Sequence, residues 1–575
     1  MRTYAIAEMK FIDVTALADA TLSTEDNQAI GNLGLFEKQT AQLSYGTLEL
    51  NQFVLDGSKE TLTDETGDIA FWSREKSLSD CTFETNPVLE VTFSNVHTSS
   101  GITLYFVEEY PAEVKVAWYD VNGAKIIEKT YHPNQLAFVC KQQVQNYTKL
   151  RIEFVKTLFP ERYVKMHYLL YGRYIAWKED IVKTAKVQEE IDETMATLSI
   201  NTADVEIIDA ENDFDIGNDD GAWKSVQKTQ EVTLTEYKDG KSIPAGTFFI
   251  DDFSFANHIA RFSMIDAIGL TDKYTFYDGE VCVNALAGPI LEKVFATAGI
   301  TKYSIADEVY NTTVSGYLEV QTCRAALQMI CFACGAVADC SRSDTIKIYK
   351  PDRTVRATIG TDRKFYGNTK VTLDEYVSGV AIKCKKYAVG TEEAEIYNDV
   401  LPEGVTRITF SEPYQPGSLD VSVGTIVTAK TNYMEVLMEE AGTCAITGLK
   451  YTASEFSYQK NVPLIEAGES ENIKNYGICT LHNASLLAEI AEHLLSYHAL
   501  RKKVDLRYLL DAEQVGNWVN IRDVKGHLST TLIESQSIDL TGGFIAIASC
   551  RGYSTVVSED VFVNEIYMNE EVGVI

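Results

Sequence analysis

The chain has 575 residues and a mass of 64.1 kDa, enough for about four domains of ordinary size. Hydrophobic residues make up 45% and charged residues 23%, a globular composition that excludes a disordered tail or a fibrous rod. The formal net charge of -32 argues against a protein that grips nucleic-acid phosphates or an anionic membrane surface, because both need clustered cations.

The N-terminus lacks the apolar core of a signal peptide, because Glu8 and Lys10 interrupt it. No stretch reaches ~18 uncharged apolar residues, the length that a membrane-spanning helix needs. We therefore expect synthesis in a cytoplasm, with neither a signal peptide nor a transmembrane segment. The 11 cysteines are scattered along the chain, which favours buried reduced thiols over a disulfide framework.

The first predicted folded unit is a β-sandwich. Residues 1–44 form an N-terminal segment, and 45–84 are expected to supply loops and edge strands. Apolar and polar residues then alternate with period 2 in the runs 89–94, 102–106, 114–118, 150–154 and 164–170. Each run places its apolar side chains on one face, so together they predict a jelly-roll-like sandwich over 45–172.

A second β-rich region follows the sandwich. Residues 174–200 are charged and Thr-rich, and we expect strand-like segments around a linker there. Strand patterns return at 231–235, 246–250 and 260–267. These patterns predict a first β-domain over 173–282.

Two helices are predicted next, at 284–304 and 318–336. In the second, apolar residues recur at helical spacing and form one stripe, which includes Cys331 and Cys334 of a C-x-x-C motif. This pattern favours a core-facing helix that ends at Gly335. A zinc or redox site would need a second cysteine pair, matched histidines or a thioredoxin-like context, and the sequence has none of these. With a strand at 345–349, the region predicts a small α/β domain over 283–352.

The C-terminal part is predicted to hold two more domains, one β over 353–470 and one α+β over 471–575. In the latter, Asn483 can cap a helix that runs to about Leu500. A strand at 504–510 and a hairpin around Gly542-Gly543 follow. The fold class is therefore mainly β with some α, in several domains.

Motifs of hydrolases, P-loop proteins and dinucleotide-binding proteins do not occur in the sequence. His493 and His498 are five positions apart, so they do not share the helix face of an i, i+4 metal pair, and packing or surface roles are expected for both. We expect no enzyme, no catalytic residue, no metal site and no cofactor.

The densest chemical feature is acidic and has no Lys or Arg between its members. It comprises Asp204, Glu206, Asp209, Glu211, Asp213, Asp215, Asp219 and Asp220. A Ca²⁺ site is one interpretation, but an EF-hand spacing counted from Asp213 ends at Lys224 instead of Glu. We favour a solvated acidic loop, which is a candidate rim of a channel or part of the outer surface.

Four aromatic residues are expected in or beside loops of the sandwich: Trp72, Tyr110, Phe159 and Tyr163. Aromatic faces can stack on sugar rings or anchor an interface. Packing under a loop is the alternative for each of them. They are the candidate residues for a surface ligand.

Several segments resemble the hub proteins of phage tails and tail-like particles from Gram-positive bacteria. They are LSINT at 198–202, FDI at 214–216, VQK at 226–228, GTFFI at 246–250, VSGYL at 314–318, CRAALQ at 323–328, GAVAD at 335–339, SRSD at 341–344, VGNWV at 515–519 and LTGGF at 540–544. The resemblance covers about 186–560. A second resemblance, to discoidin-like or carbohydrate-binding sandwiches, is carried by LDGS at 55–58 and PERY at 160–163.

The resemblance to hub proteins implies tube-like domains at 173–282 and 353–470 and hub units at 283–352 and 471–575. It implies a homotrimer in the virion that joins the hexameric tail tube to the tip or baseplate and forms part of the DNA conduit. The implied partners are the distal tail protein, the tape measure protein and tip or fibre proteins, with a possible host surface glycan and no specific nucleic-acid binding. Because the chain ends soon after its last hub-like hairpin, any lysin or spike is expected on another chain.

Acidic residues would suit a conduit, since a negatively charged lumen repels DNA phosphates and lets the polymer slide. Two other functions stay open at the level of the sequence. One is a surface-glycan-binding adhesin built from tandem β-domains. The other is a cell-wall glycosidase or peptidase.

Overall fold

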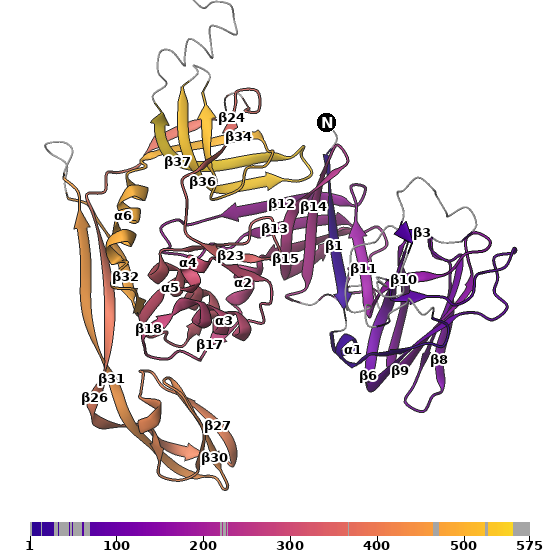
Figure 1. The fold of residues 1–575 in the computed structure, drawn as a ribbon, viewed down its shortest axis with the longest axis horizontal. Coiled ribbons are helices and arrows are strands. Elements are labelled where there is room, and N and C mark those ends of the chain that lie inside the picture. The colour runs from indigo at the N-terminus through magenta and orange to yellow at the C-terminus, as the bar shows by residue number, and fades with distance from the viewer. Residues whose placement is uncertain are drawn as a thin grey trace, which may run out of the picture.

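The computed structural model describes residues 3–12, 14–27, 33, 45–46, 49, 60–61, 69–107, 109–218, 221, 223, 226, 228–365, 367, 369–463, 471–523 and 527–555. The protein is mainly β and multi-domain, with a few short helices, which confirms the predicted fold class (Figure 1). Among these residues, no helix is both long enough and apolar enough to cross a membrane.

A main sheet of thirteen strands, counted over the described residues, organises the chain. Along its path the strands are β11 (Gly172–Trp177), β1 (Thr3–Ile12), β14 (Glu231–Lys238), β15 (Lys241–Ala256), β16 (Ile259–Ile265), β13 (Thr202–Ile208), β12 (Val182–Glu190), β36 (Leu528–Asp539), β37 (Ile545–Thr555), β34 (Lys502–Leu509) and β25 (Lys370–Leu373). β35 (Trp518–Arg522) pairs with β36, and β24 (Val355–Ile359) pairs with β35. Strands from both ends of the chain therefore meet in one sheet.

The sandwich is inserted in the chain between two paired strands at the edge of the main sheet. The chain leaves after β1 and returns through β11, which pairs antiparallel with β1. Between them lie α1 (Val14–Asp19), β2 (Thr21–Ser23), β3 (Tyr45–Gly46), β4 (Glu60–Thr61), β5 (Phe71–Trp72), β6 (Val88–Phe106), β7 (Glu113–Tyr119), β8 (Lys125–Tyr131), β9 (Ala137–Lys156) and β10 (Lys165–Leu170). Seven of these strands form the sandwich sheet, in the order β5-β10-β6-β9-β7-β8 with β2 beside β6.

Two of the predicted sandwich strands, 89–94 and 102–106, are parts of one long strand, β6. The pairing of β6 with β9 shifts register between Thr92 and Gly101. Gly101 has a φ of 142°, and a Cβ there would lie 2.5 Å from the Cys140 carbonyl oxygen. The close approach of β9 needs a glycine at this position, and the strand continues through it.

A small α/β unit follows the first half of the main sheet. Its helices are α2 (Ala267–Thr271), α3 (Ala287–Thr297), α4 (Asp307–Tyr310) and α5 (Cys323–Cys334). Its short strands are β17 (Thr275–Phe276), β18 (Cys282–Leu286), β19 (Tyr303–Ile305), β20 (Thr313–Gly316), β21 (Gln321–Thr322), β22 (Val337–Asp339) and β23 (Ile346–Tyr349). The side chain of Thr322 accepts a hydrogen bond from the Ala325 amide, and Gly335 ends α5 in the left-handed conformation, as predicted.

A long hairpin arm forms the second insertion. It consists of β26 (Gly379–Leu401) and β31 (Gly442–Asn461), and its tip carries β27 (Gly404–Thr409), the 3-10 turn η3 (Pro416–Ser418), β28 (Asp420–Val421), β29 (Thr425–Ala429) and β30 (Tyr433–Met438). β32 (Ile473–Cys479), β33 (Leu481–His482) and α6 (Leu487–His498) then lead back to β34. The Asn483 side chain accepts hydrogen bonds from the amides of Ser485 and Leu486 and so caps the turn before α6. The arm extends away from the main sheet (Figure 1).

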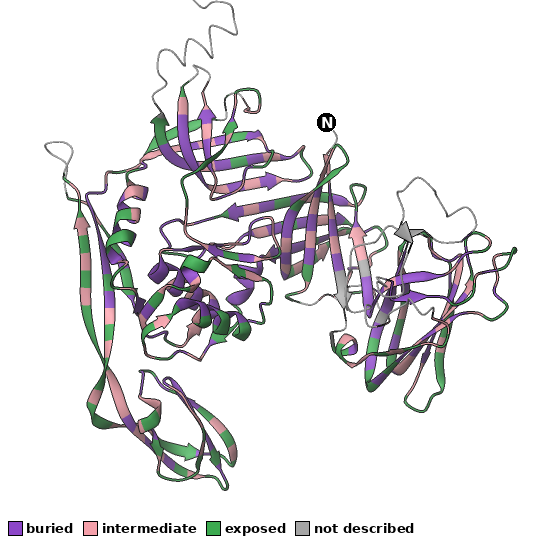
Figure 2. Ribbon diagram, in the orientation of Figure 1, coloured by how far each residue is buried: buried purple, intermediate pink, exposed green. Residues whose placement is uncertain are grey.

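The two halves of the main sheet meet where β12 pairs antiparallel with β36, from Lys186↔Asp539 to Glu190↔Ser535. We call this pairing the seam. Burial alternates over the paired residues 186–190 and 535–539, so one face of the sheet is packed there and the other is open (Figure 2). Val187 and Ile538, a cross-strand pair of the seam, share one core with Leu494 of α6.

A buried polar network crosses the packed side of the seam. The Arg342 Nε donates to the Glu189 Oε1 over 3.1 Å, and both side chains are almost inaccessible to water. Gln536 on β36 donates to the second oxygen of Glu189, and Arg342 also donates to the Glu513 carbonyl oxygen. The network ties the small α/β unit to both halves of the main sheet.

We predict that Arg342→Met lowers the free energy of unfolding by about 3 kcal/mol or more, because it leaves the Glu189 carboxylate buried without its counter-charge. The double variant Glu189→Leu/Arg342→Met should recover part of that loss. Chemical denaturation followed by fluorescence measures both. Arg356→Met, which removes an exposed pair with Asp352, is the control and should cost less than about 0.5 kcal/mol. Equal effects of Arg342→Met and Arg356→Met would contradict a stabilising role of the network.

Candidate functional site

The first two members of the acidic set lie on a strand and not in the predicted loop. Asp204 and Glu206 alternate with buried residues on β13, so both carboxylates point to the open face of the main sheet. Glu206 lies 3.1 Å from the Lys183 ammonium and 2.9 Å from the Arg261 guanidinium. The cations that the sequence lacks between the acidic residues are supplied by neighbouring strands.

The loop after β13 uses other members of the set to hold its own backbone. Asp209 is buried, and its carboxylate accepts hydrogen bonds from the amides of Asp213 and Phe214. The Asp213 carboxylate lies 3.1 Å from the Arg173 guanidinium and 3.6 Å from the Lys141 ammonium.

The remaining members of the acidic set make fewer contacts. Asp215 accepts from the Gly217 amide, and Glu211 is exposed. Asp219 and Asp220 lie outside the described residues. The described part of the chain contains no group of His, Cys, Asp and Glu that could hold a metal ion.

The four aromatic candidates of the sandwich differ in exposure. Trp72 is buried, its ring meets that of Tyr163 edge to face at 5.9 Å, and the Lys165 ammonium lies 5.0 Å from its centroid. Tyr110 and Tyr163 are half-buried. Phe159 is 48% exposed, with the Arg162 guanidinium 5.9 Å from its ring. Of the four, Phe159 presents the most ring surface to solvent, and the LDGS segment at 55–58 lies outside the described residues.

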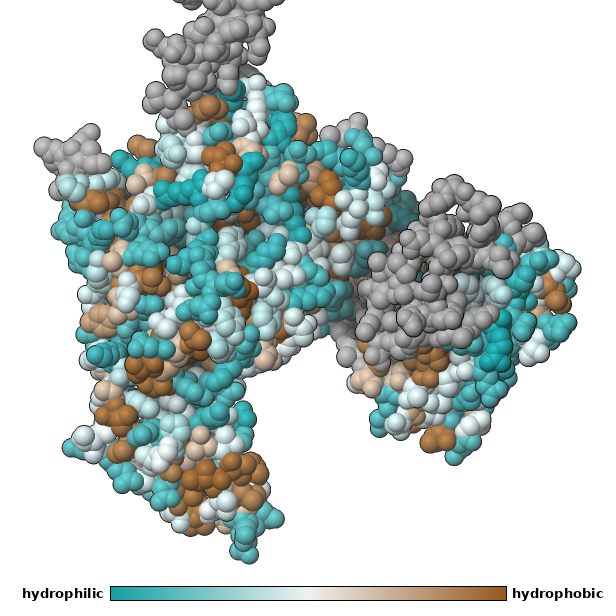
Figure 3. All heavy atoms as spheres, in the orientation of Figure 1, coloured by the Kyte–Doolittle hydropathy of each residue, from teal (hydrophilic) through white to brown (hydrophobic). Residues whose placement is uncertain are grey.

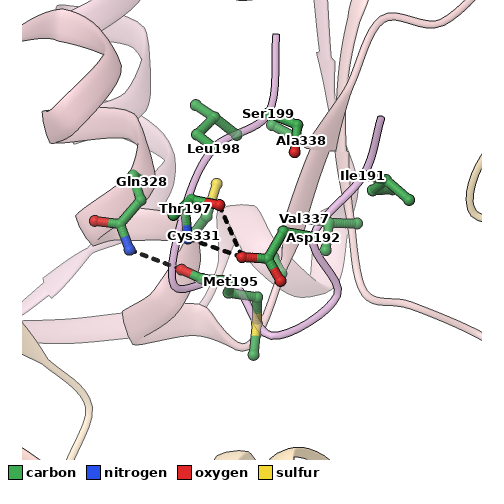
Figure 4. A pocket seen from close by; sticks show the side chains of 11 residues that line it. Ile191, Asp192, Met195, Thr197, Leu198, Ser199, Gln328, Cys331, Val337 and Ala338 are labelled. Carbon is green, nitrogen blue, oxygen red and sulfur yellow. Dashed lines mark hydrogen bonds between the residues drawn. The ribbon is translucent and has the colours of Figure 1, made fainter. Parts of the chain in front are cut away.

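The C-x-x-C motif lies in the core, as the sequence predicted. Cys331 and Cys334 are both buried on α5, and burial raises the pKa of the Cys334 thiol to about 12. Cys331 lines a small cavity between α5 and the segment 191–199 (Figure 4). There Thr197 donates to the Asp192 carboxylate and Gln328 donates to the Met195 carbonyl oxygen. The free space is about 10 Å³, room for about one water molecule and no substrate.

A second hollow lies between α6 and the loop after β23, with Lys350 and Glu489 forming an ion pair of 3.3 Å at its lining. The His493 ring nitrogen contacts the Glu193 carbonyl oxygen at 2.7 Å, and burial lowers the pKa of His493. His498 contacts the Tyr476 hydroxyl, and burial lowers its pKa to about 4. Both histidines pack within the structure, in line with the packing role expected for them.

Glu236 on β14 is an unusual carboxylate that was not predicted from the sequence. Its side chain is fully buried, and neither carboxylate oxygen has a hydrogen-bond partner among the described residues. Its cross-strand neighbours are Ala5 and Ile243. Burial, with a smaller contribution from Asp539, raises the pKa of Glu236 to about 8. The signal was present, because Glu236 continues the alternation of the buried residues Val232 and Leu234.

No protein-family model matches the sequence, and no curated protein is significantly similar to it. Among solved structures, the chain is similar to a tail protein from Neisseria meningitidis, with 10% identity, a TM-score of 0.41, and coverage of 66% of this chain and 93% of that one. It is also similar to a 43 kDa prophage tail protein from Shewanella oneidensis, with 12% identity, a TM-score of 0.37, and coverage of 64% and 93%.

A third similar structure is a family 32 carbohydrate-binding module from C. perfringens in complex with galactose, with 9% identity, a TM-score of 0.19, and coverage of 30% of this chain and 99% of that one. The two tail proteins match about two thirds of this chain, and the carbohydrate-binding module matches a smaller part. These likenesses concern the fold and not an activity.

We predict that Glu236→Gln stabilises the protein at alkaline pH. The folded state holds the Glu236 proton up to about pH 8, whereas an unfolded chain releases it near pH 4.5. The stability that the proton provides is therefore complete below pH 4.5 and is lost as the pH rises through 8. The variant should exceed the wild type by about 2 kcal/mol or more at pH 9 and match it at pH 4. Denaturation at both pH values measures this difference.

The control for this experiment is Glu231→Gln, an exposed position on the same strand. It should leave the pH dependence of stability unchanged. If Glu236→Gln is as pH-dependent as the wild type, the buried proton does not contribute to stability.

Proposed function

We propose that the chain is a structural subunit of a phage tail tip or baseplate, and that three copies form a ring that joins the tail tube to the tip around the path of the DNA. The observation that carries the proposal is the seam, because one chain holds two half-sheets side by side. Three chains supply six half-sheets, the number that a hexameric tube would meet. The site of action is the virion, with distal tail, tape measure and tip or fibre proteins as neighbours.

The open face of the main sheet suits the wall of a water-filled conduit. It carries Ser, Thr and charged residues in cross-strand rows, such as Ser263 beside Asp204, and Lys186 between Asp204 and Asp539. A Lys or Arg side chain that already faces a carboxylate is not free to bind a DNA phosphate group. Such a surface stays hydrated and offers a passing DNA strand little to bind.

The main sheet ends at an exposed edge strand, β25. All four residues of β25 are exposed, and Val371 and Leu373 are 56% and 70% accessible. Val371 pairs with the buried Val504, so the packed face of the sheet continues onto β25 without cover. Exposed apolar edge strands pair with other chains, and a ring of copies would cover this one.

The tip of the arm exposes a second apolar surface. Val405, Val427 and Leu437 are 59%, 52% and 39% accessible and lie on β27, β29 and β30, respectively. Apolar atoms gather over this end of the molecule in the space-filling view (Figure 3). Two separate uncovered apolar surfaces support a subunit that contacts several neighbours in an assembly.

We expect three copies of the chain per assembled particle tip. Cryo-electron microscopy of the particle, or quantitative mass spectrometry against a tube protein, measures the copy number. Six copies or a single copy would contradict the ring.

Val371→Asp should prevent incorporation of the chain into particles, because it places a charge on the uncovered edge. Thr372→Asp is the matched control, since it adds the same charge to the same strand on the open face of the sheet. If both variants assemble like the wild type, the β25 edge is not an interface between copies.

We also expect the purified protein to leave peptidoglycan and polysaccharide intact. The cysteines of the C-x-x-C motif are buried thiols, and the described cavities are too small for a glycan chain. A zymogram is the direct measurement. Clearing that a single carboxylate or cysteine substitution abolishes would overturn this expectation and favour the hydrolase alternative.

A further inference from the structure

Two cysteines from distant parts of the sequence lie next to each other at the root of the arm. Cys384 on β26 and Cys479 on β32 are direct partners in the parallel pairing of these strands. Both are free thiols, with exposures of 0% and 6%. Both side chains point into the same core as Leu494 of α6. Adjacent strands bring paired residues within about 5 Å, which falls in the Cα separation of disulfides.

The two thiols also interact directly. A hydrogen bond between them lowers the pKa of Cys384 and raises that of Cys479. Such sharing of a proton favours the thiolate that disulfide exchange requires. β32 is the outer strand of its sheet, and Cys479 is the more exposed of the two residues.

We propose that Cys384 and Cys479 are a redox pair, reduced in the cytoplasm and joined as a disulfide once the protein meets a small-molecule disulfide such as oxidised glutathione. One thiol loses its proton, and its sulfur attacks the glutathione disulfide and releases one glutathione thiolate. The second cysteine thiolate then displaces the other glutathione from the mixed disulfide. The protein loses two protons and two electrons, and oxidised glutathione is reduced to two molecules of glutathione.

The bond would clamp the arm at its base. It joins the strand that enters the arm to the strand that follows it, and the closed loop contains the arm from Cys384 onward, with its tip. A cross-link that closes a long loop restricts the unfolded chain more than one that closes a short loop. In the proposed tail role, the clamp would form after cell lysis, but the redox chemistry itself does not depend on that role.

The experiment starts from full-length protein purified with reductant, which is then incubated with oxidised glutathione. The sample is alkylated under denaturing conditions and digested with trypsin. The sequence places lysines on both sides of Cys384 and Lys474 before Cys479, so the disulfide joins two separate peptides. Cys331 and Cys334 share one tryptic peptide, so their disulfide would have a different mass signature. We expect the linked pair of peptides and the loss of two of the 11 thiols, both reversed by dithiothreitol.

Cys384→Ser and Cys479→Ser should each retain the partner thiol and abolish the linked peptides. Cys550→Ser is the matched control, because Cys550 is buried in the main sheet with no pairing to another cysteine in its strand registers. The proposal is overturned if all thiols survive oxidation or if the linked peptides involve other cysteines. It is also overturned if the Cys384→Ser and Cys479→Ser variants still lose two thiols on oxidation. Particle assembly is not measured here, so failure of the redox pair leaves the proposed tail role untouched.

Discussion

The antiparallel pairing of β12 with β36 is the interaction on which the rest of the molecule depends. The two strands are more than three hundred positions apart in the sequence, and their pairing joins two half-sheets into one. The small α/β unit and α6 then pack on the side of the sheet that the seam closes. Without the pairing, β12 and β36 would each be a free sheet edge, and the shared core would open along both.

The sandwich and the arm are both inserted between paired strands of the main sheet. The sandwich leaves from β1 and returns through β11, and the arm leaves after β25 and returns before β34. In each case the two flanking strands pair with each other, so the main sheet is continuous at the point of insertion. A large inserted unit therefore adds little strain to the sheet that carries it.

Local patterns predicted much of the fold, and long-range pairing accounts for most of what was missed. Alternation located parts of β6, β7, β9 and β10 in the sandwich, and of β14. The strand predicted at 504–510 matches β34, the Gly542-Gly543 turn signal located the β36–β37 hairpin, and the helical stripe with Gly335 located α5. The sequence could not show that β1 lies beside β14, although Ala5, Ala7 and Met9 are buried at alternate positions of that strand. Nor could it show that β24 and β25 belong with the C-terminal strands, because strand partners are fixed by packing across the whole chain.

The candidate sites were less predictable, and for a physical reason. The acidic set seemed free of cations because Lys and Arg are absent from that stretch, yet Lys183, Arg261 and Arg173 approach it from other elements. The resemblance to tail hub proteins, in contrast, rested on whole segments and not on single side chains.

The charged residues of the main sheet therefore behave differently on its packed face and on its open face. On the packed side, Glu189 needs Arg342 and Gln536, and Glu236 keeps its proton, because an unpaired carboxylate is costly away from water. On the open side, Glu206 faces Lys183 and Arg261 while remaining in contact with solvent. In a ring of copies, the sliding of DNA would depend on a hydrated wall of paired charges and hydroxyl groups, with the net charge of the chain acting at longer range.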